Sequence, residues 1–148
     1  MTATTSIRWQ TCEQLVNLLR ASASLSGVTV EPGWPGDRVP VAQLIWLDEI
    51  DGQIAVPVMT GGRKQRADTF TLSIQMRVIG LGTLDETMTR LFELVAVVEN
   101  LLANDTSLGS LDGVLSAELT NGRQTSAMFP EGPAAYGELT LTVESRLL

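Results

Sequence analysis

Histidine is absent from this chain of 148 residues, and cysteine occurs once, as Cys12. These absences exclude a disulfide framework, a zinc site of the Cys/His type and any nucleophile activated by histidine. An enzyme built on this chain would depend on carboxylates, hydroxyls or Tyr136, and the sequence singles out no pair of them. We therefore expect a protein that is not an enzyme, with no catalytic residue, no metal ligand and no cofactor.

Long hydrophobic runs are also missing. The most apolar stretch, residues 91–102, is interrupted by Glu93, Glu99 and Asn100, whereas a membrane span needs about 20 apolar residues. The first ten residues lack the basic start and apolar core of a secretory signal. The sequence thus predicts a protein made inside the cell, with no membrane contact.

Basic residues are scarce, since 10 Lys and Arg stand against 17 Asp and Glu for a net charge of −7. General affinity for nucleic acid needs a basic face, because contacts to phosphate dominate that affinity. We expect the chain as a whole to repel DNA. The remaining composition, 44% hydrophobic and 18% charged, is typical of a globular protein, and the length suits one domain over residues 1–148.

Helical spacing of apolar residues occurs twice. It predicts a first helix over 6–25, with Ser6 as N-cap and Gly27 as its stop, after a frayed lead-in of residues 1–5. Thr83 and Glu86 form a capping-box pattern that opens a second helix ending near Ala103. The stripe expected to be buried on this second helix is Met88, Leu91, Phe92, Val95, Val98, Leu101 and Leu102.

Alternating patterns predict the strands. Residues 69–79 and 136–147 alternate apolar and polar side chains, and shorter strands are expected at 28–31 and 114–120. Asp51-Gly52 predicts a tight hairpin turn between strands at 43–49 and 53–58. If the two longest strands pair, Arg77 and Glu144 would form a cross-strand ion pair. The order of elements predicts an α+β fold: a single domain with two helices packed on a mostly antiparallel five- to six-stranded sheet.

Acidic and glycine-rich motifs are better explained by structure than by ligand binding. Asp48, Glu49 and Asp51 lack the further oxygen ligands of a calcium loop, so we interpret them as a solvated hairpin tip. Gly80-Leu81-Gly82 resembles the start of a dinucleotide-binding turn. However, Asp85 occupies the third glycine position, and a pyrophosphate would meet its negative charge.

Three loops, at 32–40, 60–68 and 121–133, contain the candidate contact residues. Trp34 lies between prolines and glycines and is either a lid on the core or a partner contact. Arg63, Lys64 and Arg66 follow two glycines, either as a solvated mobile tip or as a contact for a polyanion or an acidic protein surface. The polar loop 121–133, with Arg123, is either mobile or a contact surface.

This pattern resembles the tail terminator (tail completion) proteins of long-tailed bacteriophages over roughly residues 7–147. The resemblance is carried by a leading amphipathic helix, a hairpin around Ile45-Trp46-Leu47 and Asp51-Gly52, and a basic loop that runs into the segment 66–72. It continues with the helix that contains Leu91-Phe92-Glu93 and the final alternating strand. Length and acidic charge also fit.

The resemblance implies a structural virion protein, a homohexameric ring at the head-proximal end of the tail. Such a ring caps the tail tube, stops its polymerisation and presents a docking surface for the head. Its implied partners are other copies of itself, the tail tube protein, a head-completion or connector protein, and DNA that passes through the lumen without sequence-specific binding. Assembly would take place in the host cytoplasm.

Carried over to this sequence, the resemblance makes Arg63, Lys64 and Arg66 contacts for an acidic neighbouring ring or for DNA. The loop 121–133 becomes a second docking surface. Two alternatives stay open at this point. One is another head–tail connector, neck or tail component of similar outline, and the other is a host-type binding domain or small enzyme.

Overall fold

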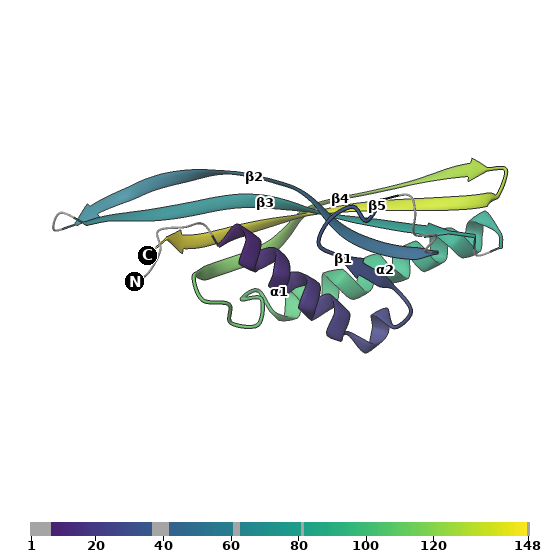
Figure 1. The fold of residues 1–148 in the computed structure, drawn as a ribbon, viewed down its shortest axis with the longest axis horizontal. Helices are drawn as coiled ribbons and strands as arrows, with labels where there is room; N and C mark the ends of the chain where they lie inside the picture. The colour runs from purple at the N-terminus through teal and green to yellow at the C-terminus, as the bar shows by residue number, and fades with distance from the viewer. Residues whose placement is uncertain (1–6, 37–41, 61–62, 81, 148) are drawn as a thin grey trace.

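The computed structural model describes residues 7–36, 42–60, 63–80 and 82–147, and the side chains of 53–60, 63–67 and 146–147 lie outside the description. The described residues form an α+β fold in which both helices cover one face of a sheet (Figure 1). This confirms the predicted fold class. Within this part of the chain no helix is long and apolar enough to cross a membrane. The elements are α1 (Arg8–Ala21), a 3-10 turn (Ala23–Leu25), β1 (Thr29–Glu31), β2 (Gln43–Thr60), β3 (Arg63–Ile79), α2 (Leu84–Asn104), β4 (Val114–Phe129) and β5 (Gly132–Leu147).

The sheet has the strand order β1-β2-β3-β5-β4. Only β1 and β2 are parallel among the described pairs, and the other neighbours are antiparallel. The four long strands run along the long axis of the molecule, and β4 forms one edge of the sheet (Figure 1).

The core lies between the helices and the inner face of this sheet. The alternation predicted for β3 is confirmed, because its inward-facing apolar side chains are fully buried. Gly137 on β5 lies beneath α2, where an added Cβ would be 3.3 Å from Leu91 Cδ1. The missing side chain therefore lets the helix pack close to the sheet. The central buried residues are Leu15, Leu19, Phe70, Leu72, Ile74, Met76, Val78, Leu91, Leu94, Val98, Leu141 and Val143.

The predicted start of α2 is confirmed, with Thr83 as its N-cap. The Thr83 hydroxyl accepts a hydrogen bond from the Glu86 backbone N–H at 3.2 Å and also bonds the Glu86 carboxylate at 3.2 Å. The N-cap of α1 is Ile7, which makes no side-chain capping bond, and the predicted cap Ser6 and lead-in 1–5 lie outside the described residues.

The prediction of a hairpin turn at Asp51-Gly52 is wrong, because β2 runs straight through this dipeptide. Gly52 lies opposite Phe70 of β3, and a Cβ at this position would overlap the Thr69 carbonyl oxygen and the Phe70 Cα. Glycine is needed here for the close approach of two strands rather than for a turn. The nearby acids Asp48 and Asp51 are exposed along the strand, where a register shift between Leu47 and Ile50 marks a bulge.

Two of the three predicted loops are largely strand. Residues 63–68 belong to β3, and 121–129 with 132–133 belong to β4 and β5, so that only Pro130-Glu131 forms the turn. Their polar and glycine-rich sequence suggested loops, but backbone pairing with the neighbouring strand satisfies the peptide groups without an apolar face. In the third loop, 32–36 has neither helix nor strand, and 37–40 lies outside the described residues.

The predicted burial of Phe92 is wrong, since its side chain is 50% exposed. Successive helical residues are about 100° apart around the axis, so the residue after the fully buried Leu91 turns toward solvent. The buried stripe instead includes Leu94, which the sequence pattern did not single out.

Candidate functional site

The predicted basic contact residues lie on a projecting pair of strands. The backbones of Arg63 and Lys64 pair with Thr60 and Met59 of β2. Arg66 lies opposite a second register shift in β2 between Ala55 and Val58. This shift contains Pro57, a residue that lacks a donor for the ladder and is tolerated at bulges.

We define the β2–β3 arm as residues 53–60 with 63–67. In Figure 1 this arm extends well beyond both helices. The β3–β5 pairing ends with Arg66 opposite Leu147, so beyond that point the described arm consists of β2 and β3 alone. An isolated two-stranded ribbon is only marginally stable in water. The outermost part of the arm, residues 58–60 with 63–65, is therefore a stretch of ribbon that a partner strand or surface would stabilise.

A buried ion pair anchors the base of the arm to α1. Arg8 donates two hydrogen bonds to the Asp68 carboxylate, Nε to Oδ2 at 3.0 Å and an Nη to Oδ1 at 2.8 Å. The Asp68 side chain is fully buried, and the Arg8 guanidinium also lies 5.5 Å from the Phe70 ring centroid. The hydrogen bonds to Asp68 raise the pKa of Arg8 above its ordinary value.

Sequence reasoning missed this pair, although the pattern held a signal for it. Asp68 continues the inward-facing series Phe70 and Leu72, so the alternation places a carboxylate on the buried face of β3. A buried carboxylate needs a charged or hydrogen-bonding partner. The sequence alone did not show that the partner comes from α1, 60 positions away.

Trp34 packs on the outer face of the sheet, the face that the helices leave uncovered. Its ring centroid lies 4.9 Å from that of Trp46, at an interplanar angle of 62°, and the Arg77 guanidinium lies 5.3 Å from the Trp34 ring centroid. Trp46 lies on the outer face because it alternates with the buried Ile45 and Leu47. Trp34 therefore covers the outer face rather than the helix-covered core, and it stays 47% exposed.

The expected ion pair between Arg77 and Glu144 does not form in the described structure. Although β3 and β5 pair, Arg77 lies opposite Tyr136, and Glu144 lies opposite Thr69. The Arg77 Nε is buried and has no hydrogen-bond partner within the described part of the chain. Beside Arg77, a hollow of about 290 Å³ is bordered by Phe129 and Tyr136, so this face offers an apolar contact surface next to a cation.

Arg123 lies on β4, not in a loop. It is opposite Glu138 of β5, and an Nη lies 3.4 Å from the Glu138 Oε2. The Arg123 side chain is 79% exposed, so this pair contributes only about 0–1 kcal/mol. Its guanidinium is accessible to a partner.

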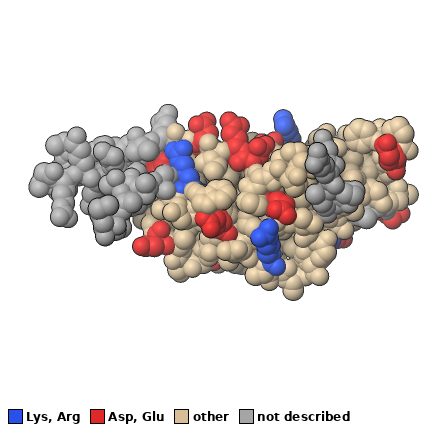
Figure 2. Space-filling model, in the orientation of Figure 1, with Lys and Arg blue, Asp and Glu red and all other residues tan. Residues whose placement is uncertain are grey.

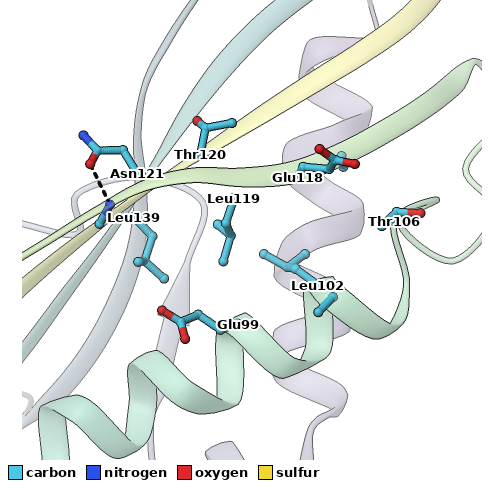
Figure 3. Close-up of a pocket in the computed structure, with 11 residues that line it drawn as sticks. Glu99, Leu102, Thr106, Glu118, Leu119, Thr120, Asn121 and Leu139 are labelled. Atoms are coloured by element: carbon cyan, nitrogen blue, oxygen red, sulfur yellow. Dashed lines mark hydrogen bonds between the residues drawn. The ribbon is translucent and has the colours of Figure 1, made fainter.

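A groove of about 600 Å³ lies between the C-terminal end of α2 and β4, as Figure 3 shows. We call it the α2–β4 groove. Along the groove, a register shift between Leu119 and Asn121 marks an irregularity in the edge strand β4. Its lining residues are Glu99, Leu102, Ala103, Thr106, Ala117, Glu118, Leu119, Thr120, Asn121, Gly122 and Leu139.

The groove combines an apolar floor with acidic borders. Leu119 points from β4 toward Leu102 of α2, and Glu99 extends from α2 toward Leu139 (Figure 3). Glu99 and Glu118 are both exposed, and the lining includes no Lys or Arg. Such a surface suits an extended, apolar segment that also carries positive charge.

The groove also borders an open sheet edge. β4 pairs only with β5 among the described strands, so no described strand lies along its other side. At Ala117 this side is covered by the loop after α2, since the Ala117 N–H donates to the Thr106 carbonyl at 2.8 Å. Unpaired strand edges are templates for pairing with another chain.

Charge on the described surface is dispersed. Over the part of the molecule that Figure 2 draws in colour, acidic groups are spread along this view, with several gathered at its upper rim, and the basic groups stand apart from one another. Among the described residues, no group of three or more Cys, Asp or Glu side chains is arranged to hold a metal ion.

Comparisons with known proteins show the fold alone. No protein-family model matches the sequence, and no curated protein matches it either. Among solved structures, the chain is similar to one described as the virion of a native gene transfer agent (GTA) particle, with 14% sequence identity and a TM-score of 0.59. The match covers 91% of this chain and 93% of the other, so the two share a fold over nearly their full lengths.

Proposed function

We propose that this chain is a structural protein of a phage-like virion, and more specifically the subunit of a tail terminator ring. The observation that carries the proposal is the fold shared with a chain of a gene transfer agent virion, which extends over nearly the whole of both chains. The order of helices and strands and the acidic composition also resemble those of tail terminator proteins, which are virion proteins of the same kind.

The shape of the subunit supports a ring. The arm lies at one end of the molecule, and the open edge of β4 is a different surface on the opposite side of the sheet order (Figure 1). Contacts between two different surfaces are head-to-tail, and they close into rings when the rotation between subunits permits. The terminator role requires six subunits around a hole wide enough for duplex DNA.

The proposed ring contacts the tail tube protein on one side and a head-completion or connector protein on the other. DNA passes through the lumen without sequence-specific contacts, and the net charge of −7 opposes adhesion to phosphate. We also propose that the chain is not an enzyme, because a chain without histidine has no imidazole acid or base. The ring would be located at the head-proximal end of the tail, after assembly in the host cytoplasm.

Native mass measured over a wide concentration range, with negative-stain images of the largest species, tests the ring. We expect a hexamer with a central hole. A stable compact dimer or trimer without a hole would contradict the terminator proposal.

Position on the particle separates a terminator from another connector or tail component. We would bind an antibody against this chain to purified tails and image them by electron microscopy. The antibody should label the end to which heads attach. Label at the opposite end, or along the tube, would assign the chain to a different virion component.

A further inference from the structure

We infer that the β2–β3 arm of one copy binds in the α2–β4 groove of a neighbouring copy, alongside the open edge of β4. The inference concerns the contact between two copies. It rests on the proposed function in one respect, namely that repeated contacts close into a ring. The two surfaces belong to the same chain but lie on different elements, so each copy offers one arm and one groove.

The arm lacks a covering layer of its own. Figure 1 shows no helix over it, and past Arg66 no described residue of β5 pairs with β3. Yet its β2 half is rich in apolar residues, namely Ile54, Ala55, Val56, Val58 and Met59. A partner surface that covers apolar residues and removes them from water lowers the free energy of the complex.

Charge complementarity selects the groove as the receiving surface. Residues 53–67 contain Arg63, Lys64 and Arg66, and they contain no acid. The groove is bordered by Glu99 and Glu118, and its lining contains no base. Opposite charge on the two surfaces favours the encounter between copies and sets the register of the contact.

The shape of the groove also suits an extended segment of chain. Its apolar floor runs along an edge strand whose outer side is open beyond Ala117 in the described structure. A strand laid along such an edge pairs its backbone with it and places alternate side chains on the floor. The arm supplies strands already held in extended form by their mutual pairing.

Two charge-reversed full-length variants test the contact. The arm variant carries Arg63→Glu, Lys64→Glu and Arg66→Glu, and the groove variant carries Glu99→Lys and Glu118→Lys. Each should retain the circular dichroism spectrum and melting temperature of the wild type, because the groove carboxylates are exposed and the arm extends beyond both helices (Figure 1). Each alone should assemble at least about tenfold more weakly than the wild type, because like charges then face each other.

An equimolar mixture gives the decisive result. When the two variants alternate around an assembly, the acidic arm of the arm variant contacts the basic groove of the groove variant. At the next contact, the unchanged basic arm of the groove variant contacts the unchanged acidic groove of the arm variant. The mixture should therefore recover assemblies in which native mass shows the variants at 1:1. Assembly of each variant alone at wild-type strength would overturn the arm–groove contact, as would a mixture that fails to recover.

Cysteine cross-linking reports the contact even when association is weak. Cys12 is buried, and burial raises the pKa of its thiol to about 11, so it adds little background. The double variant Thr60→Cys with Ala103→Cys should give a ladder of disulfide-linked oligomers under oxidising conditions. Each single variant should stop at a dimer, and Thr60→Cys with Ser24→Cys, an exposed site on the 3-10 turn, should give no ladder.

The outcomes separate this inference from the proposed function. A ring without the Thr60–Ala103 cross-link would overturn the arm–groove contact and leave the terminator proposal standing. The cross-link in a species that never closes into a ring would support the contact and contradict the terminator. If the groove variant forms normal rings but fails to join tails, another virion protein occupies the groove, and the inference is wrong.

Discussion

At the scale of single residues, the ion pair between Arg8 and Asp68 links α1 to the base of the arm. Replacement Asp68→Asn leaves a partly buried guanidinium with a neutral neighbour. Removal of one partner from a buried pair costs about 3–5 kcal/mol, and we expect the lower end because the Arg8 side chain is 27% exposed. Urea unfolding monitored by circular dichroism measures the loss.

The matched control is Arg123→Gln, which breaks the exposed pair with Glu138. This change should lower the free energy of unfolding by no more than about 1 kcal/mol. Equal losses from the two variants would show that the Arg8–Asp68 pair has no special role at the base of the arm.

At the scale of elements, α2 carries two neighbouring side chains with opposite environments. Leu91→Ala should cost about 2–5 kcal/mol, because Leu91 is fully buried against the sheet at Gly137. Phe92→Ala should cost less than about 1 kcal/mol, although the aromatic ring is the larger group, because half of it is exposed. Thermal or urea unfolding of the two variants side by side measures the difference. A larger loss for Phe92 would mean that the helix is rotated.

The loop after α2 provides a pH-dependent prediction. The Asp105 carboxylate accepts hydrogen bonds from the Ser107 hydroxyl at 2.7 Å and from the Gly109 N–H at 2.7 Å, and these bonds lower its pKa below the ordinary value of 3.8. A lowered carboxyl pKa stabilises the fold above the unfolded value, and this contribution disappears as pH falls through the folded value.

The variant Asp105→Ala isolates that contribution. Wild type should be more stable than the variant at neutral pH, and the difference should shrink as pH falls below about 3.8. Urea unfolding of both proteins at several pH values measures it. A difference that is constant across this range would mean that ionised Asp105 does not hold the loop.

At the scale of the whole molecule, charge governs how the assembly meets DNA. With 10 basic and 17 acidic residues, the protein should show no measurable binding to duplex DNA by fluorescence anisotropy at physiological salt. The arm variant with its three charges reversed serves as a control, and it should be indistinguishable from the wild type in this assay. Salt-sensitive binding by the wild type alone would show that the arm contacts phosphate rather than a protein surface.

The sequence determined the features that depend on neighbours along the chain. The alternation of residues 69–79, the N-cap at Thr83 and the two amphipathic helices are local patterns, and the structure confirms each of them. They suffice for the fold class, because apolar faces of known periodicity have few ways to cover one another. The absence of histidine likewise excludes imidazole chemistry, whatever fold the chain adopts.

Tertiary structure decided what depends on residues far apart in the chain. Asp51-Gly52 has the composition of a turn, but its contact with Phe70 makes it part of a long strand. Residues 63–66 and 121–129 have the composition of loops, but the strands beside them pair their backbones. The arm, the α2–β4 groove and the packing of Trp34 on Trp46 all depend on such long-range contacts. No local pattern in the sequence shows which strand forms the edge of the sheet or which end of a helix lies beside that edge.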